Sequence, residues 1–219
     1  MKNSVSYKGF RLSEINRLEY RHLWYLIAWP AYFIMHFLTE WLIPEEICTP
    51  VHCFLDDVIP FCEYFVIAYV GWYFLVFFTL LYFLKNNVTI FKNLMKFIIV
   101  AQIAAMIIYI LFPNRQDLRP TEFVRDNVFA DLVKLLYSAD TNTNVCPSLH
   151  VSFSLAVASA WAKEKAISVR YRAMHILFCL LVCASVAFIK QHSVVDILVA
   201  VPICILAEFI AYRKYYLHT

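Results

Sequence analysis

The chain has 219 residues, of which 62% are hydrophobic and only 16% are charged. Soluble domains contain about 45–50% apolar and about 25% charged residues, so this composition is typical of a membrane protein. Two glycines exclude a glycine-rich nucleotide fold, and a net charge of +3 is too small to indicate nucleic-acid binding. At this length we expect one membrane domain over residues 1–219.

One run of apolar residues, 65–84, contains no charged side chain and is long enough to cross a bilayer as a helix. Five weaker runs have helix length and lack the two-residue alternation of barrel strands, and lipid admits only helices or closed barrels. These runs are 23–42, 92–112, 147–162, 172–190 and 194–212. The predicted fold is therefore all-α, an integral membrane bundle of six transmembrane helices.

Lysine and arginine are unevenly divided between the two sets of loops that this topology defines. The N-terminal arm, the second and fourth loops and the tail hold 14 of the 19 basic residues, and the other three loops hold 5. Because basic loops stay in the cytoplasm, we expect both termini inside and loops one, three and five outside. Residues 1–22 mix apolar with basic residues and are expected to form an interfacial arm on the inner surface.

Seven cysteines are present, and they divide by expected depth. Cys48 and Cys53 fall in the first outer loop, where the pair could form a disulfide. No cysteine spacing is that of a zinc ribbon.

Three polar segments, 113–120, 146–150 and 190–196, are far apart in the sequence. In the predicted topology all three fall at the outer ends of helices. This convergence is the feature of the sequence that most favours a functional site.

The segment around Pro147 opens the fourth predicted span. Proline suits the first helical position, because the N–H that it lacks would be unpaired there. The N–H groups of Ser148, Leu149 and His150 would then point outward at a helix end that binds phosphate readily. The alternative is an ordinary proline-started helix with an interfacial histidine, and such helix starts are common.

His192 and Asp196 are four residues apart and therefore share one helix face. A carboxylate in that position can hydrogen-bond one ring nitrogen and leave the other nitrogen nucleophilic. The alternative is a polar pair that only tethers two helices.

Besides Lys134, four basic residues lie on the outer side, where the topology disfavours them: Arg115, Arg119, Arg125 and Lys190. Any one of them alone could form a surface salt bridge or contact a lipid headgroup. Several of them near one helix N-terminus favour an anionic ligand, and Arg119 and Lys190 are nearest to the other motifs.

Together these motifs resemble those of the type 2 phosphatidic acid phosphatase superfamily, which comprises integral-membrane lipid phosphatases and phosphotransferases. The resemblance covers about residues 112–200 and rests, in order, on Arg119-Pro120, Pro147-Ser148-x-His150 and His192-x3-Asp196. Pro-Ser-Leu-His is similar to the branch that includes the inositol phosphorylceramide synthases.

Three positions depart from the family pattern. Phe112 stands where the family has a lysine, Val186 where it has an arginine, and Leu149 where it has a glycine. The two missing cations leave open a non-catalytic lipid-binding or transport protein that retains a degenerate site.

The resemblance implies a covalent mechanism. His192 would attack phosphorus to form a phosphohistidine, Asp196 would hold its ring, and His150 would protonate the departing lipid oxygen. Arg119 and Lys190, with the N–H groups near Ser148, would hold the phosphate oxygens. Lys190, together with Arg115 or Arg125, would replace the two missing cations, and no cofactor or metal is implied.

The expected function is that of a lipid phosphatase that hydrolyses a phosphomonoester or diphosphate lipid at the outer membrane face. A phosphotransferase that passes the phosphoryl-linked group to an alcohol is the alternative with the same first step. The expected partners are a lipid phosphate substrate and membrane lipids, and the expected location is a bacterial cytoplasmic membrane.

Overall fold

The computed structural model describes residues 4–217. The chain is 71% helical with almost no sheet, which confirms the predicted all-α class. The α-helices are α1 (Ala28–Leu42), α2 (Phe54–Val58), α3 (Val66–Asn86), α4 (Val88–Leu111), α5 (Val128–Ala139), α6 (Leu149–Lys163), α7 (Val169–Phe188) and α8 (Val194–Tyr216). Short 3-10 helices are η1 (Leu12–Glu14), η2 (Arg21–Ile27), η3 (Glu45–Ile47) and η4 (Glu63–Phe65).

Four helical segments of the described chain are long and apolar enough to cross a membrane: Glu63–Asn86, Val88–Leu111, Val169–Phe188 and Val194–Tyr216. The other two predicted spans, α1 and α6, have 15 residues each. A full crossing takes about 20 residues. The regular helix α1 begins late because the 3-10 turn η2 precedes it, and α6 ends at Lys163.

Helix α6 lies at the centre of the bundle, where it packs against α3, α4, α7 and α8. Its buried face carries small side chains, among them Ser152, Ala156 and Ala160, which are at most 1% exposed. Small residues let helix backbones approach closely. Because neighbouring helices surround α6, little of its backbone faces outward, although the helix is short.

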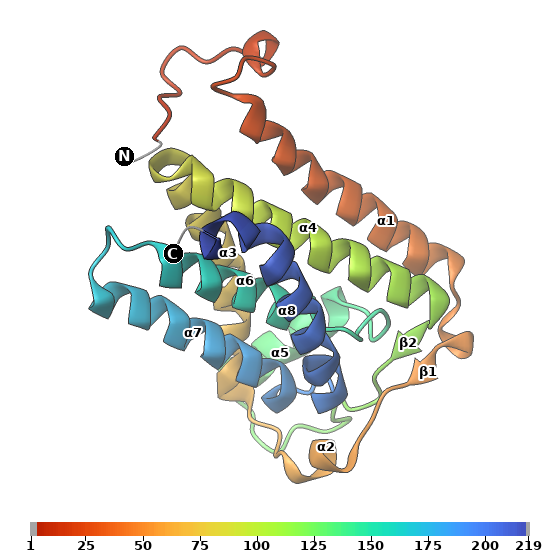
Figure 1. Cartoon of the computed structure of the whole chain (residues 1–219). Helices are drawn as coiled ribbons and strands as arrows, with labels where there is room; N and C mark the ends of the chain where they lie inside the picture. Colours follow the sequence, from red (N-terminus) through yellow and green to blue (C-terminus); the bar gives the residue numbers. More distant parts are fainter. Residues whose placement is uncertain (1–3, 218–219) are drawn as a thin grey trace.

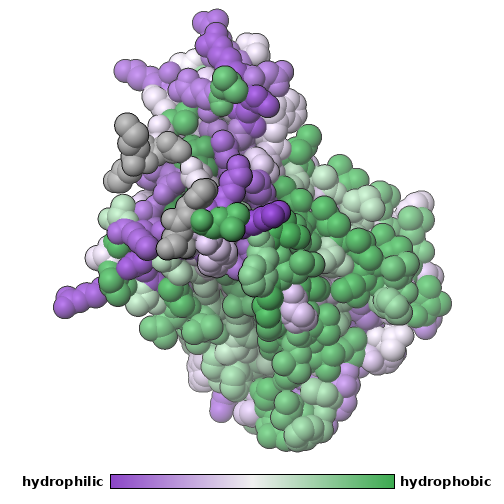
Figure 2. All heavy atoms as spheres, viewed as in Figure 1, coloured by the Kyte–Doolittle hydropathy of each residue, from purple (hydrophilic) through white to green (hydrophobic). Residues whose placement is uncertain are grey.

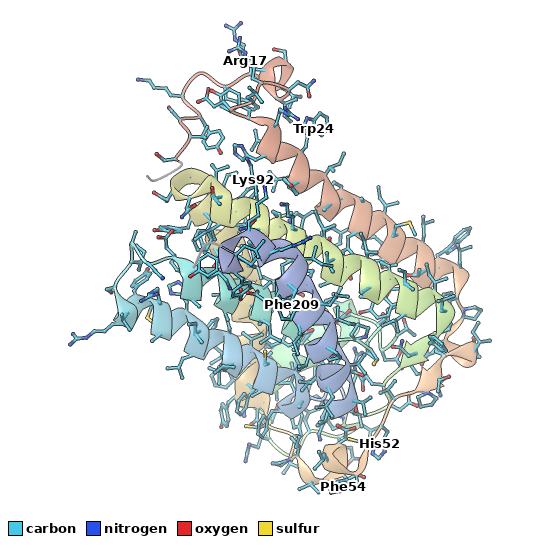
Figure 3. All side chains as sticks on the ribbon, viewed as in Figure 1. Arg17, Trp24, His52, Phe54, Lys92 and Phe209 are labelled. Carbon is cyan, nitrogen blue, oxygen red and sulfur yellow. The ribbon has the colours of Figure 1, made fainter. Side chains whose placement is uncertain are left out.

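The two ends of the bundle differ. Both termini lie at one end, whereas α2 and the short strands lie at the other (Figure 1). Hydrophilic side chains gather around the N-terminal arm, and hydrophobic side chains cover much of the helical face below it (Figure 2). Arg17 and Lys92 mark the first end and His52 and Phe54 the second (Figure 3).

Backbone pairing joins the loops at the end far from the termini. Strand β1 (Thr49–Pro50) runs parallel to β2 (Asn114–Arg115), and Arg115 forms an antiparallel bridge with Thr143. The loop after α1, the loop after α4 and the segment before α6 are therefore held side by side. All seven cysteines are free, so Cys48 and Cys53 do not form a disulfide.

Candidate active site

The turn between α7 and α8 presents His192. Lys190 has a left-handed backbone (φ 55°), which reverses the chain after α7. The N–H groups of Gln191 and His192 then both donate to the Val186 carbonyl, at 3.0 and 3.1 Å. His192 consequently stands immediately before Ser193, the N-cap residue of α8.

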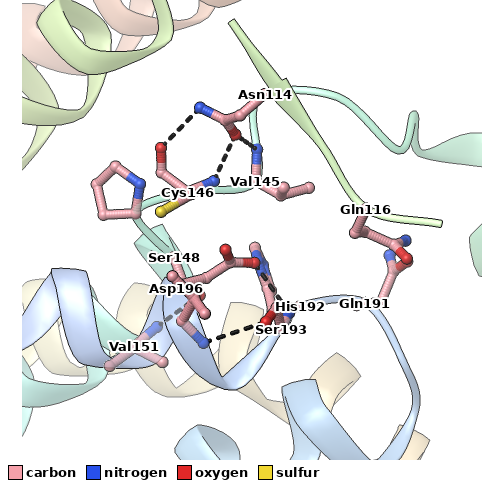
Figure 4. Close-up of polar contacts among 12 residues, drawn as sticks. Asn114, Gln116, Val145, Cys146, Ser148, Val151, Gln191, His192, Ser193 and Asp196 are labelled. Carbon is pink, nitrogen blue, oxygen red and sulfur yellow. Dashed lines mark hydrogen bonds and ion pairs between the residues drawn. The ribbon is translucent and has the colours of Figure 1, made fainter. Parts of the chain in front are cut away.

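The predicted pairing of His192 with Asp196 is present. Asp196 Oδ2 lies 3.1 Å from His192 Nδ1 and also accepts the Ser193 N–H at 3.0 Å (Figure 4). An ionised carboxylate only accepts hydrogen bonds, so Nδ1 carries the hydrogen and Nε2 keeps its lone pair. His192 is 8% exposed, and its Nε2 has no hydrogen-bond partner among residues 4–217.

His150, in the first turn of α6, lies next to His192. The centroids of the two imidazole rings are 5.7 Å apart. Tyr69 and Trp72 of α3 hold the His150 ring, each with its own ring centroid 4.3 Å away. His150 Nε2 is buried without a partner in the described part of the chain. The two histidines therefore face one shared space.

The start of α6 differs from the prediction that Pro147 is its first residue. The helix begins at Leu149 and Ser148 is the N-cap, because the Ser148 Oγ accepts the Val151 N–H at 3.4 Å. The Ser148 N–H donates to the Asp196 carbonyl at 3.2 Å and does not point outward. Tyr109 fixes Pro147 by donating to its carbonyl at 2.8 Å. Ser148 thus joins the ends of α6 and α8.

Asn114 holds the segment that leads into α6 (Figure 4). Its Oδ1 accepts the N–H groups of Val145 and Cys146 at 3.0 and 2.7 Å. Its Nδ2 donates to the carbonyls of Phe112 and Cys146 at 2.9 and 3.0 Å. Asn114 belongs to the polar segment 113–120 that the sequence singled out, but this supporting role has no sequence signature.

Asp56 in α2 is a second residue that the sequence did not indicate. Its carboxylate accepts the Ser193 hydroxyl at 2.5 Å and the N–H groups of Val194 and Cys53 at 2.8 Å each. Burial alone would raise the pKa of Asp56, but these hydrogen bonds outweigh it, so the pKa is lowered. The carboxylate therefore anchors the start of α8 beside His192.

The buried thiol of Cys146 also lies beside Asp196. Burial and the neighbouring carboxylate raise the pKa of Cys146 to about 12. A thiol with such a pKa stays protonated near neutral pH and is a poor nucleophile. His192 is thus the better nucleophile in this cluster.

His150 and His192 line a cavity of about 640 Å³. It is bounded by α1, α3, the start of α6 and segment 139–145, and beyond the histidines its walls are mostly apolar. The apolar lining includes Trp29, Phe33, Phe37, Val76, Phe77 and Leu80. Lining residues on α3 extend from Trp72 to Leu84, a rise of about 18 Å. One leaflet contributes about 15 Å of hydrocarbon, so the cavity has the length of a lipid tail.

Arg119 and Lys190, the two cations expected to bind phosphate, do not line this cavity. Arg119 donates to the Gln191 side chain at 3.0 Å, and its guanidinium also bonds the carbonyls at the end of α5 and just after it. Lys190 Nζ donates to the carbonyls of Asp56 and Ile59, both at 2.6 Å. Both side chains stabilise the turns around His192.

Arg115 and Arg125 also lie outside the cavity. Arg115 pairs with Asp117 at 3.2 Å. Arg125 pairs with Glu63 at 3.0 Å. Of the predicted site residues, the structure therefore gathers His150, His192, Asp196 and Ser148, and places the four cations around them in contact with protein oxygens.

No family model matches the chain, and neither a curated protein nor a solved structure matches it. Within residues 4–217, no group of three or more His, Cys, Asp or Glu side chains is arranged to hold a metal ion.

Proposed function

We propose that this protein is a membrane enzyme that cleaves the phosphate ester of a lipid through a phosphohistidine on His192. One observation carries the proposal: His192 Nδ1 bonds Asp196 at 3.1 Å, so that its free Nε2 shares a space with His150. Oriented imidazoles of this kind act as nucleophile and as general acid.

The reaction begins with attack of His192 Nε2 on phosphorus. The bond from phosphorus to the lipid oxygen breaks, and that oxygen takes a proton from the protonated His150. The negative charge of the bound phosphate favours this protonated form. Water then attacks phosphorus as His150 removes its proton, the N–P bond breaks, and free His192 is restored.

Neutral donors near the two histidines would hold the phosphate oxygens. The N–H groups of Leu149 and His150 at the start of α6 have no hydrogen-bond partner among the described residues. The N-terminus of a helix of this length favours negative charge. Arg119 acts on the site indirectly, because its guanidinium holds the Gln191 side chain at the cavity wall.

A lipid is the substrate that fits the shape of the cavity. Its histidine end is polar, and its long wall along α3 is apolar and as deep as one leaflet. A soluble phosphate ester would leave that apolar wall without a ligand.

The membrane placement that accompanies this function has six spans. We propose that α1, together with η2, and the short α6 complete the set begun by the four long helices. Most lysines and arginines then fall at the end that carries both termini, which is cytoplasmic by the rule for basic loops. The histidine cavity opens on the outer side.

Transfer to an alcohol is a second candidate that one observation favours. His192 is only 8% exposed and is approached through a mostly apolar cavity, which admits a lipid alcohol more readily than bulk water. Products distinguish the two reactions. Release of a water-soluble phosphate with water as the only acceptor indicates hydrolysis.

The test is to incubate purified protein with a panel of lipids labelled with ³²P at the phosphate. We expect label on the protein that is stable to base and labile to acid, as phosphohistidine is. His192→Ala should abolish both label and turnover. His52→Ala is the matched control, because His52 also pairs with an aspartate, Asp57 at 2.9 Å, but lies exposed outside the cavity.

Unchanged lipid conversion by His192→Ala would contradict the proposal. Lipid binding without conversion by any form of the protein would favour the non-catalytic alternative.

A further inference from the structure

The end of the cavity beside His192 carries two carboxylates. Glu40 comes from the last turn of α1, and Asp140 is the residue that follows α5. Thr141 joins them, since it follows Asp140 in the chain and donates its hydroxyl hydrogen to Glu40. Asp140 also accepts a hydrogen bond from Gln191 Nε2 at 3.1 Å.

The base on the cavity wall nearest to Glu40 is the imidazole of His36, 3.5 Å away. Among residues 4–217, no lysine or arginine lines the cavity. Burial raises the pKa of Asp140 against the opposing effects of His192 and Arg119, and the nearby Glu40 raises it further. Two carboxylates in one partly buried space repel each other, and a bound cation relieves that repulsion.

Aromatic rings line the same part of the cavity. Tyr32 comes from α1 and Tyr73 comes from α3. The Tyr32 ring stacks on His36, with centroids 5.6 Å apart, and His36 in turn lies 3.5 Å from Glu40. Aromatic faces attract ammonium groups, including quaternary ones.

A phosphomonoester and a zwitterionic phosphodiester differ at this end of the cavity. The monoester is close to doubly negative near neutral pH and would meet two carboxylates with no lysine or arginine beside it. The zwitterionic diester carries one negative charge, and its cationic group can lie against those carboxylates.

We propose that the substrate is a zwitterionic phosphodiester lipid, whose amine or quaternary ammonium lies between Glu40 and Asp140 while its phosphate lies at His192 and His150. This inference rests on the proposed function and names its substrate class. The bond broken is the one between phosphorus and the lipid alcohol, because His150 lies at the start of the apolar wall, beside Trp72.

The proposed reaction has two steps. His192 Nε2 bonds to phosphorus, the lipid oxygen leaves with a proton from His150, and the phosphorylated amino alcohol stays on His192. In the second step water gives one proton to His150 and its oxygen to phosphorus, and the bond between His192 Nε2 and phosphorus breaks. The products are a lipid alcohol and a phosphorylated amino alcohol.

The experiment uses the full chain in nonionic micelles with four dihexanoyl lipids: phosphatidylcholine, phosphatidylethanolamine, phosphatidylinositol and phosphatidic acid. We expect kcat/KM for a choline or ethanolamine lipid to exceed the other two by about tenfold or more. The double variant Glu40→Gln/Asp140→Asn should lose that preference. Asp131→Asn is the control, because Asp131 is an exposed carboxylate on α5 that pairs with Lys134.

A His192-dependent preference for phosphatidic acid or phosphatidylinositol would overturn this inference and leave the proposed function standing. Absence of turnover and of phosphohistidine with all four lipids would overturn the proposed function itself. Binding of each of the four lipids to His192→Ala tests recognition of the headgroup separately from catalysis. The fluorescence of Trp29 and Trp72 in the cavity wall reports the binding. Equal affinity for the choline lipid and phosphatidic acid would contradict a cation site between Glu40 and Asp140.

Discussion

Arg119 Nε donates to Gln191 Oε1 at 3.0 Å, and Gln191 directly precedes His192 in the chain. Its Nη1 donates to the carbonyls of Tyr137 and Asp140, and its Nη2 donates to the carbonyl of Thr141. A planar fork with several donors makes all these bonds at once, and a lysine cannot. Arg119 therefore positions the turn that carries His192, the proposed nucleophile, from behind the cavity wall.

Arg119→Lys is expected to lower kcat by about tenfold or more with little change in KM, because small displacements of a reacting group are costly. Steady-state kinetics on the labelled lipid measures the two constants separately. Arg125→Lys is the control, since Arg125 pairs with Glu63 outside the cavity. A rise in KM with unchanged kcat would instead indicate that Arg119 binds the substrate phosphate.

Asp196→Asn tests the orientation of the nucleophile. The amide can donate to Nδ1, which would move the ring hydrogen to Nε2 and remove the nucleophilic lone pair. We expect a loss of about 10³-fold or more in the rate of His192 labelling. A rapid-quench measurement of the first turnover gives that rate, and Asp57→Asn, which alters the exposed His52 pair, should leave it unchanged.

The sequence was sufficient for the features that depend on local spacing. His192 and Asp196 contact each other although His192 lies just before the N-cap of α8, because Asp196 is the third residue of the helix and its carboxylate reaches back over the helix start. To predict that His150 lies near His192, it was also necessary to predict that two helix ends meet at one end of the bundle. The order of the apolar segments predicted that placement.

The sequence could not predict where long side chains point. The left-handed backbone at Lys190 belongs to the tertiary turn, and the Lys190 ammonium bonds the carbonyls of Asp56 in α2 and Ile59 just after it. Glu40, Asp56 and Asp140 come from three segments whose spacing is set only by the folded loops. No local pattern marks these acids as neighbours of His192.

Asn114→Ala tests the support of the segment that enters α6. The substitution leaves the N–H groups of Val145 and Cys146 and the carbonyls of Phe112 and Cys146 without this partner. Unpaired buried groups cost about 1–3 kcal/mol each, so we expect a loss of about 3 kcal/mol in the free energy of unfolding. Thermal unfolding in detergent measures it. Asn86→Ala, which removes one exposed bond to Tyr82, should unfold like the parent chain.

The proposed orientation predicts the accessibility of an introduced cysteine. Asn142 lies in the loop before α6 at the histidine end, and Lys165 lies between α6 and α7. A membrane-impermeant thiol reagent should label Asn142→Cys in intact cells above the level of the parent chain, and Lys165→Cys only after lysis. The opposite pattern would reverse the topology and place the cavity on the cytoplasmic side.

The lowered pKa of Asp56 predicts that the stability of the fold decreases at low pH. Its folded-state pKa is lowered from the ordinary value of 3.8 by the hydrogen bonds from Ser193, Val194 and Cys53, which outweigh burial. A carboxyl of this kind stabilises the fold above its unfolded pKa, and the stabilisation disappears as the pH falls through the folded pKa. We therefore expect the unfolding free energy to decline below about pH 4, where the unfolded carboxyl begins to take up its proton.

Asp56→Asn should remove that part of the pH dependence and lower stability at neutral pH by about 2 kcal/mol, since a buried acceptor of three hydrogen bonds is weakened. Denaturant unfolding in detergent between pH 3 and pH 7 measures both effects. Asp57→Asn changes the neighbouring exposed carboxylate and should retain the parent curve. Because Asp56 holds Ser193 beside His192, the Asn variant should also lose activity, and equal activity at every pH would show that the anchor is dispensable for the nucleophile.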